Sequence, residues 1–233
     1  MNYRERHVII TGGTGALGSA VVNLLVRAGA VCHVPFINRA EAERFALRNE
    51  ASVILAEVAD LSDETAVASF YKNVPQLWAS IHLAGGFAMS PVTDTSKTDL
   101  MKQIDMNFTT AFLCCRAAVT AMLREGRGGR IVNVASRPAL EWRLGSGMAG
   151  YTASKAAVAA LTTALAEEVA NRDILVNAVA PSTMDTEANR KAMPKADHAA
   201  WPKVEEVAAV ILFLASPENR VTRGAVVPVY GRS

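Results

Sequence analysis

The chain has few cysteines, and none of them is spaced as a metal ligand would be. There are three cysteines, an odd number, and all lie in apolar runs: Cys32, Cys114 and Cys115. This favours reduced, buried thiols over disulfides. The chain also lacks an uninterrupted apolar run of about 18 residues, the length that a membrane-spanning helix needs. Its polar start, 1–6, is unlike a signal peptide. These absences predict a cytoplasmic protein with no metal site and no membrane span.

A strong excess of one charge is missing as well. The sequence has 24 lysine and arginine residues against 22 aspartate and glutamate residues, which gives a net charge of +2. These charges are dispersed, so we expect no nucleic-acid partner and no anionic membrane surface. Apolar residues make up 51% of the chain, enough for a large core, which excludes a disordered protein.

Short apolar runs alternate with helical patterns along all 233 residues. This rhythm predicts an α/β fold: a single Rossmann-type, doubly wound domain over 1–233, with a seven-stranded parallel sheet and helices on both faces. No linker or repeat divides the chain, and 181–202 is expected to be a loop with a short polar helix that covers a substrate. Strands are predicted at 7–11, 31–36, 52–58, 78–83, 130–135, 174–180 and 225–229, helices at 19–28, 40–49, 63–72, 98–125, 151–172 and 204–215, and loops at 87–97 and 137–150.

A glycine-rich turn separates the first predicted strand from the first helix. Its sequence is Gly12-Gly13-Thr14-Gly15-Ala16-Leu17-Gly18. Such a turn lets the backbone approach a ligand closely, and the helix N-terminus offers free N–H groups to a pyrophosphate. A second glycine pair, Gly85-Gly86, ends the fourth strand and permits the same approach. The turns predict a dinucleotide site; the alternative is that they are turns without a ligand.

The second predicted strand ends without a carboxylate. An acidic residue at that place would bind the ribose hydroxyls of the cofactor and favour NAD. Phe36 occupies the position here and is followed by Ile37, Asn38 and Arg39. Because Arg39 can reach a 2′-phosphate, the pattern favours NADP(H) over NAD(H), unless this side chain merely lies in solvent.

Tyr151 and Lys155 are four residues apart in a predicted helix, so they share one face. A phenol has an ordinary pKa of about 10, and a nearby cation lowers it. A hydroxyl such as that of Ser136 can hold a substrate oxygen against the phenol. Together these groups can move a proton to or from a carbonyl or an alcohol while a hydride moves elsewhere.

These motifs fall at the carboxyl ends of the predicted strands, where a parallel sheet binds its ligands. Asp60 follows the third strand, Asn107 lies in the long helix, "IVNVAS" delivers Ser136, and "VNAVAPSTMDT" occupies 176–186. In this order and over its whole length, the sequence resembles the short-chain dehydrogenase/reductase family.

The resemblance implies a role for each of these side chains. Tyr151 would be the proton donor or acceptor, Lys155 would bind the nicotinamide ribose and lower the pKa of the phenol, and Ser136 would steady the substrate oxygen. Asn107 would hold a water in the proton relay, and Asp60 would contact the adenine. Family members are homodimers or homotetramers through the helices that carry Asn107 and Tyr151. The implied cofactor-binding residues are Gly12, Thr14, Gly15, Ala16, Leu17, Gly18, Asn38, Arg39, Asp60, Leu61, Ala84, Gly85, Gly86, Tyr151, Lys155, Pro181, Ser182 and Thr183.

Several positions depart from the family pattern. Ala16 replaces the middle glycine of the turn, and His82-Leu83-Ala84-Gly85 replaces the usual N-N-A-G. The interval from Ser136 to the tyrosine is two residues longer than in 3-oxoacyl carrier-protein reductases. The A-G-G sequence and the loop at 185–201 resemble dihydropteridine reductase, although that enzyme lacks the serine and carries an acid after its second strand.

Three functions therefore stay open. The first is an NAD(P)H-dependent oxidoreductase that transfers a hydride between nicotinamide and a small carbonyl or alcohol, with Tyr151 as general acid or base. The second is a quinonoid dihydropteridine reductase, for which the loop at 185–201 argues. The third is a nucleotide-binding protein without turnover. An apolar or flat substrate pocket is suggested by five large apolar residues near the site, Trp142, Met148, Met184, Met193 and Trp201.

Overall fold

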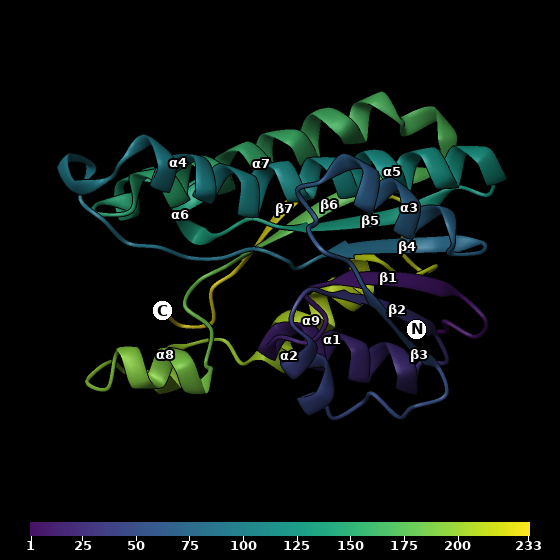
Figure 1. Cartoon of the computed structure of the whole chain (residues 1–233), viewed down its shortest axis with the longest axis horizontal. Coiled ribbons are helices and arrows are strands. Elements are labelled where there is room, and N and C mark those ends of the chain that lie inside the picture. Colours follow the sequence, from purple (N-terminus) through teal and green to yellow (C-terminus); the bar gives the residue numbers. More distant parts are fainter.

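Seven parallel strands form one sheet in the computed structural model, which describes residues 1–233. Their spatial order is β3-β2-β1-β4-β5-β6-β7 (Figure 1). The prediction of a seven-stranded parallel sheet is confirmed. The strands are β1 (His7–Thr11), β2 (Val31–Phe36), β3 (Val53–Glu57), β4 (Leu77–His82), β5 (Gly129–Val134), β6 (Ile174–Pro181) and β7 (Val226–Val229).

Helices cover both faces of the sheet (Figure 1). On one face α1 packs against α9, and on the other α3 packs against α5, which lies with α4 and α7. The helices are α1 (Ala16–Arg27), α2 (Arg39–Arg44), α3 (Glu64–Lys72), α4 (Lys97–Ile104), α5 (Thr110–Glu125), α6 (Arg137–Leu140), α7 (Ala149–Glu168), α8 (Glu187–Ala192) and α9 (Val204–Leu214).

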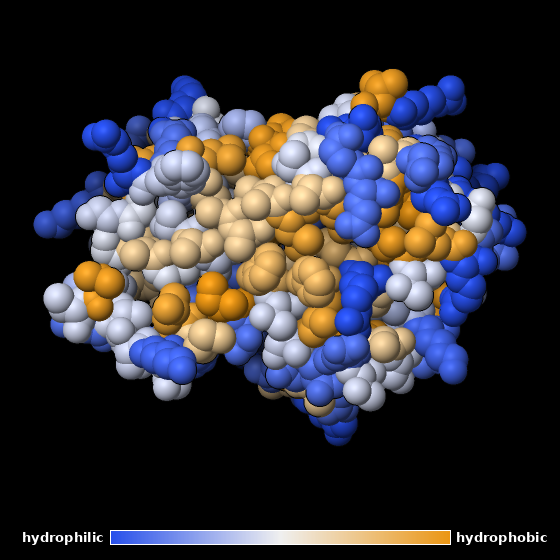
Figure 2. Space-filling view, turned by 90° about the horizontal axis from the view of Figure 1, so that it is seen from above, coloured by the Kyte–Doolittle hydropathy of each residue, from blue (hydrophilic) through white to orange (hydrophobic).

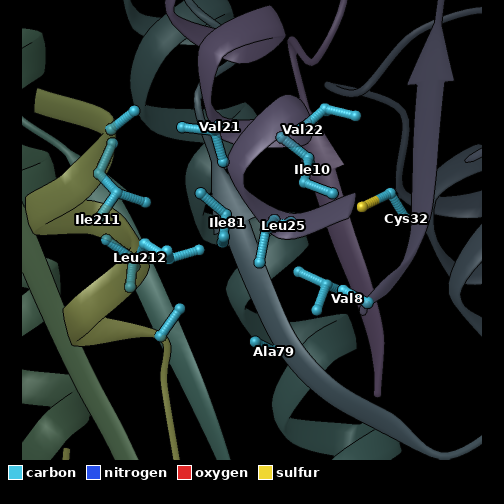
Figure 3. Packing of buried hydrophobic residues seen from close by; sticks show 14 of the residues in the cluster. Val8, Ile10, Val21, Val22, Leu25, Cys32, Ala79, Ile81, Ile211 and Leu212 are labelled. Carbon is cyan, nitrogen blue, oxygen red and sulfur yellow. The ribbon is translucent and has the colours of Figure 1, made fainter. Parts of the chain in front are cut away.

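Two hydrophobic cores lie on opposite faces of the sheet, and β1 contributes to both. Side chains alternate between the faces of a strand, so Val8 and Ile10 enter the core under α1 and α9, while Ile9 enters the other. Figure 3 shows the first core, in which Leu25 of α1 and Ile211 of α9 meet the side chains of β1 and β4. Burial on both faces explains why the strands are almost continuously apolar.

The direction in which successive strands are added to the sheet reverses between β1 and β4. From β1 the sheet grows outward to β2 and β3, and from β4 it grows the other way to β7. The helices that follow β1 and β4 therefore lie on opposite faces, and a crevice opens between the carboxyl ends of these two strands. Both predicted glycine turns lie at this crevice.

The helix predicted over 98–125 is not continuous. It begins at Lys97, after a capping box in which Ser96 Oγ accepts a hydrogen bond from Asp99 N and the Asp99 carboxylate accepts one from Ser96 N. A π-helical turn over Asp105–Thr109 then separates α4 from α5. Such turns insert one residue into a helix and are common at functional sites. Here the turn carries Asn107.

Other segments differ from the prediction in smaller ways. The predicted loop 137–150 contains α6 and a 3₁₀ turn at Trp142–Gly145. Pro138 fits the first turn of α6, where a helix needs no N–H donor. Helix α2 ends at Arg44, whereas the pattern predicted a helix to residue 49. The short polar helix expected within 181–202 is α8, which Thr186 caps.

The segment Lys97–Glu125 is long and apolar enough to cross a membrane, by length and hydropathy alone. Half of its most apolar stretch is buried inside the domain. Its second part, α5, packs against α3 and β4. The apolar composition is therefore accounted for by a helix of the domain core.

A buried chain of hydrogen bonds crosses β4 and β5 below the crevice. Thr162 Oγ1 donates to the Val158 carbonyl at 2.8 Å, so it accepts from Asn133 Nδ2 at 2.9 Å. This orients the amide so that Asn133 Oδ1 faces His82 Nδ1 at 2.8 Å, and that nitrogen must carry the proton. His82 Nε2 lies 2.8 Å from Ser80 Oγ, which can donate a hydrogen bond to the neutral ring. The network places a proton on Nδ1 and ties β4 to β5 and α7.

Burial lowers the pKa of His82 to about 4, although the Asn133 hydrogen bond opposes this effect. As pH falls below the ordinary value of 6.5, the unfolded chain takes up this proton first, so the free energy of unfolding decreases until about pH 4. The expected loss is on the order of 3 kcal/mol.

Urea unfolding of the wild type and of His82→Asn at pH 7 and pH 4 measures this loss. We expect the wild type to lose more stability than the variant. His33, whose pKa is also lowered to about 4, affects both proteins equally. The same pH dependence in both proteins would contradict the assignment.

Candidate active site

The glycine turn after β1 lies directly against the end of β4. Gly12 has φ of +67°, a conformation that favours glycine, and a Cβ at this position would lie 2.8 Å from Ala84 N. The residue is therefore required both for the turn and for the contact. This close approach forms the floor of the crevice between β1 and β4.

Two connected hollows extend from this floor. The outer one, of about 1040 Å³, lies between the glycine turn, the end of β2 and α4. The inner one, of about 320 Å³, reaches the start of α7. Gly12 and Gly85 line both hollows, so the two form one cleft. Of the predicted residues, Thr14, Asn38, Asp60, Leu61 and Ala84 line the outer hollow, and Gly15, Ala16, Leu17, Gly18, Gly86, Ser136, Tyr151, Lys155, Pro181 and Ser182 line the inner one.

Three predicted residues do not line the cleft: Arg39, Thr183 and Asn107. Arg39 donates to Glu57 at 2.6 Å, and both side chains are exposed. The structure therefore directs the guanidinium toward β3, away from the cleft. The role expected for Arg39 at a 2′-phosphate stays a prediction.

Ser136 follows β5 and is the residue just before α6. Its Oγ is buried and has no hydrogen-bond partner. Buried hydroxyls nearly always have a partner, and this one lines the inner hollow beside Tyr151. An unpaired hydroxyl at this place fits the oxygen of a bound substrate.

Tyr151 lies in the first turn of α7, and its phenol lines the inner hollow. Burial raises its pKa above the ordinary value, while the Ser136 hydroxyl acts in the opposite direction. The lowering that the sequence led us to expect from Lys155 is not seen, because the shift of the Tyr151 pKa comes from burial and, less strongly, from Ser136. A phenol with a raised pKa keeps its proton at neutral pH and can act as a general acid.

Lys155 lies one turn further along α7 and is buried. Its Nζ donates to the Val134 carbonyl at 2.9 Å, and no carboxylate pairs with it. Burial lowers its pKa to about 8. An ammonium has three N–H donors, so two remain free in the hollow. Hydroxyl groups of a ribose fit this donor set.

Asn107 supports the cleft from behind. Its Oδ1 accepts from Gly86 N at 3.1 Å and its Nδ2 donates to the Gly86 carbonyl at 3.0 Å. Its Nδ2 also donates to the Gln103 carbonyl at 3.1 Å, so the amide joins the second glycine turn to α4. The water that Asn107 was expected to hold stays a prediction.

Sequence reasoning did not identify Phe87 and Glu41 as site residues. The Phe87 ring meets the Tyr151 ring edge-on, with centroids 5.0 Å apart and planes at 82°, and it is 62% exposed. Its position directly after Gly85-Gly86 was the available signal. Glu41 lines the outer hollow from the first turn of α2. It was missed because only the end of β2 was considered.

The short chain dehydrogenase family profile matches residues 6–197. The chain belongs to the short-chain dehydrogenase/reductase family. It is therefore an oxidoreductase of the dehydrogenase and reductase class, and the family predicted from the sequence is confirmed. Members of this family use nicotinamide cofactors, and the glycine cradle and the free Lys155 donors fit such a group.

Curated relatives of this short-chain dehydrogenase/reductase cover nearly the whole chain. Galactitol 2-dehydrogenase of Rhizobium johnstonii is 32% identical over 98% of this chain and 97% of its own length. The 3-oxoacyl-[acyl-carrier-protein] reductase of Rickettsia felis is 30% identical over 96% of this chain and 94% of its own. They differ in substrate, and neither favours the dihydropteridine reductase alternative.

Solved structures agree with the fold. The structure of gox2181 superposes with a TM-score of 0.91 at 28% identity and covers 99% of this chain and 96% of its own. The structure of ElxO, which has NADP bound, superposes with a TM-score of 0.88 at 24% identity and covers 97% of this chain and 98% of its own. The fold is thus one that accommodates a nicotinamide cofactor. A preference for NADP over NAD is not established by it.

Gly85→Ala tests the support of the cleft. A Cβ there would lie 2.6 Å from Asn107 Oδ1 and 3.3 Å from Lys155 Nζ. We expect dinucleotide affinity to fall by at least about 10-fold, because the amide must give up its bonds to Gly86. Fluorescence titration with NADH and NADPH measures this.

Gly126→Ala is the matched control. Gly126 has positive φ, +65°, which Gly85 does not have; nothing lies within 4 Å of a Cβ at Gly126, and the residue is outside the cleft. The control should lose about 1 kcal/mol of stability through strain and keep its dinucleotide affinity. Equal losses of affinity in both variants would show that general destabilisation explains the effect.

Proposed function

We propose that this short-chain dehydrogenase/reductase transfers a hydride between NAD(P)(H) and a small carbonyl or alcohol, with Tyr151 as the general acid or base. The observation that carries the proposal is the unpaired, buried Ser136 hydroxyl beside a buried phenol in the cofactor cleft. A bound nicotinamide supplies or accepts the hydride. The protein's own groups handle the oxygen and its proton.

In the direction of reduction, Ser136 donates a hydrogen bond to the carbonyl oxygen and holds it against the Tyr151 hydroxyl. As the carbon gains the hydride, the oxygen becomes basic and takes the phenolic proton. Burial of Tyr151 keeps that proton in place until it is needed. Lys155 binds the cofactor ribose and stabilises the phenolate that is left, which then regains a proton from solvent. Oxidation of the alcohol follows the reverse path.

Tyr151→Phe removes the transferable proton and leaves the ring in place. We expect kcat to fall about 100- to 10,000-fold, the usual contribution of general acid–base catalysis. Dinucleotide affinity should stay within a factor of about 2, because the ring still lines the inner hollow. Oxidation of NADH or NADPH with a panel of ketones measures turnover, and fluorescence titration measures binding.

A kcat of the Tyr151→Phe variant equal to that of the wild type would contradict the role of Tyr151 as general acid or base. Tight dinucleotide binding by the wild type without turnover on any ketone, aldehyde or alcohol would favour the third hypothesis, a nucleotide-binding protein.

We further propose that the substrate carries an apolar, flat group beside its reacting oxygen. Lys155 is the only charged residue that lines the inner hollow, so nothing there matches a charged substrate end. The exposed ring of Phe87 and the side chain of Met184 form its apolar wall. The segment 181–202, which includes α8, would cover a substrate bound there.

Phe87→Ala tests the apolar wall. We expect KM for an aryl alkyl ketone to rise about 3- to 10-fold with little change in kcat, because an aromatic contact is lost while the proton donor remains. Phe213→Ala, which removes an exposed phenylalanine from α9, is the matched control. A fall in kcat at constant KM would instead assign Phe87 to the orientation of Tyr151.

We propose that the protein acts in the cytoplasm and forms a homodimer or homotetramer. The oligomer is supported by the face formed by α5 and α7, over which hydrophobic residues gather (Figure 2). Phe112 and Leu123 of α5 are more than two-fifths exposed on their own. Exposed apolar surface of this kind marks an interface.

The preference for NADP(H) that the sequence predicted depends on Arg39. Its ion pair with Glu57 is exposed, and such pairs contribute only about 0–1 kcal/mol. Arg39 would therefore have to leave Glu57 to bind a 2′-phosphate. Arg39 does not line the outer hollow, whereas Glu41 of the same helix does.

A further inference from the structure

Three carboxylates line the outer hollow, those of Glu41, Asp60 and Asp105, and only that of Glu41 forms a hydrogen bond to the glycine turn. Glu41 lies in the first turn of α2, and its Oε2 accepts a hydrogen bond from Thr14 Oγ1 at 3.3 Å. Thr14 belongs to the glycine turn, and both residues line the hollow together with Asn38. The carboxylate thus bridges the turn after β1 and the segment after β2.

The local fold explains how a residue beyond the strand reaches this place. Asn38 Oδ1 accepts a hydrogen bond from Ala40 N at 3.0 Å and begins α2 immediately after β2. Side chains of a helix lean toward its N-terminus. Glu41, in the first turn, therefore leans back over the end of β2 and toward Thr14.

The position is the one at which dinucleotide-binding folds read the adenosine ribose. The pyrophosphate lies on the glycine turn, and a carboxylate near the end of the second strand accepts hydrogen bonds from the ribose hydroxyls. A 2′-phosphate brought to the same place would face the negative charge of Glu41. Thr14 offers only a hydroxyl, which does not offset that charge.

Cations near Glu41 do not neutralise it. Arg39, two residues earlier, pairs with Glu57 at 2.6 Å, and this contact holds the pKa of the guanidinium above its usual value. Lys97 and Lys102 line the hollow from α4, but neither forms an ion pair with Glu41. The carboxylate is therefore free to act on a ligand.

We propose that Glu41 selects NAD(H) over NADP(H), by accepting a hydrogen bond from the 2′-hydroxyl of the adenosine ribose and repelling a 2′-phosphate. The inference rests on the proposed function, since it concerns the cofactor of the same site. It gives the opposite preference to the one predicted from Arg39. The reason is that a negative charge lies in the cleft and the arginine lies outside it.

The test is a fluorescence titration of the whole protein with NADH and with NADPH. We expect the wild type to bind NADH at least about 10-fold more tightly, the effect of one hydrogen bond to a charged group. Glu41→Gln should bind NADH about 10-fold more weakly and NADPH more tightly than the wild type. Glu43→Gln removes the same charge from the same helix, outside the cleft, and should keep the wild-type ratio.

Three results would overturn the inference. One is tighter binding of NADPH by the wild type together with an unchanged ratio in Glu41→Gln. Another is an equal change of the ratio in Glu43→Gln, which would assign the effect to net charge. The third is a selective loss of NADPH affinity in Arg39→Ala, which would return the choice of cofactor to Arg39.

The same titration separates this inference from the proposed function. If neither dinucleotide binds the wild type, the proposed function fails and the inference fails with it. If both bind and a ketone is reduced while Glu41→Gln behaves like the wild type, only the role of Glu41 is wrong.

Discussion

The close approach of the turn after β1 to the end of β4 is the constraint on which the site depends. At this point the strand order reverses, and the space between Gly12 and Ala84 does not admit a side chain. The two hollows meet there, so a ligand that spans them contacts both turns. Binding of a dinucleotide in the cleft would depend on this contact, because it places the N-terminus of α1 and backbone N–H groups along one cleft.

Burial, rather than any pairing of charges, sets the chemistry of the inner hollow. Removing Tyr151 and Lys155 from water raises the pKa of the phenol and lowers that of the ammonium, since each change favours the neutral form. The inner hollow therefore holds a protonated phenol and an ammonium that is easily neutralised. Hydroxyl groups of a cofactor ribose would restore hydrogen bonds to the ammonium and favour its charged form.

The polar network below the cleft joins elements that carry the candidate site. His82 is buried between Ser80 and Asn133. Burial keeps its ring neutral at pH 7, and the hydrogen bonds of the network link β4, β5 and α7. Because α7 carries Tyr151 and β5 delivers Ser136, the network ties together the two groups that we propose to hold and protonate a substrate oxygen.

Local patterns in the sequence determined most of the fold and the identity of the candidate catalytic groups. Apolar runs of strand length, the glycine turns and the four-residue spacing of Tyr151 and Lys155 depend only on neighbouring residues, so they can be read without the structure. The direction in which a side chain points cannot be read in this way. The sequence does not show that Arg39 turns to Glu57, that Glu41 turns back to Thr14 or that Phe87 meets Tyr151, because each contact joins elements that only the folded sheet brings together. The π-helical turn at Asn107 and the direction of the Tyr151 pKa shift were likewise decided by tertiary packing and by burial, which local periodicity does not report.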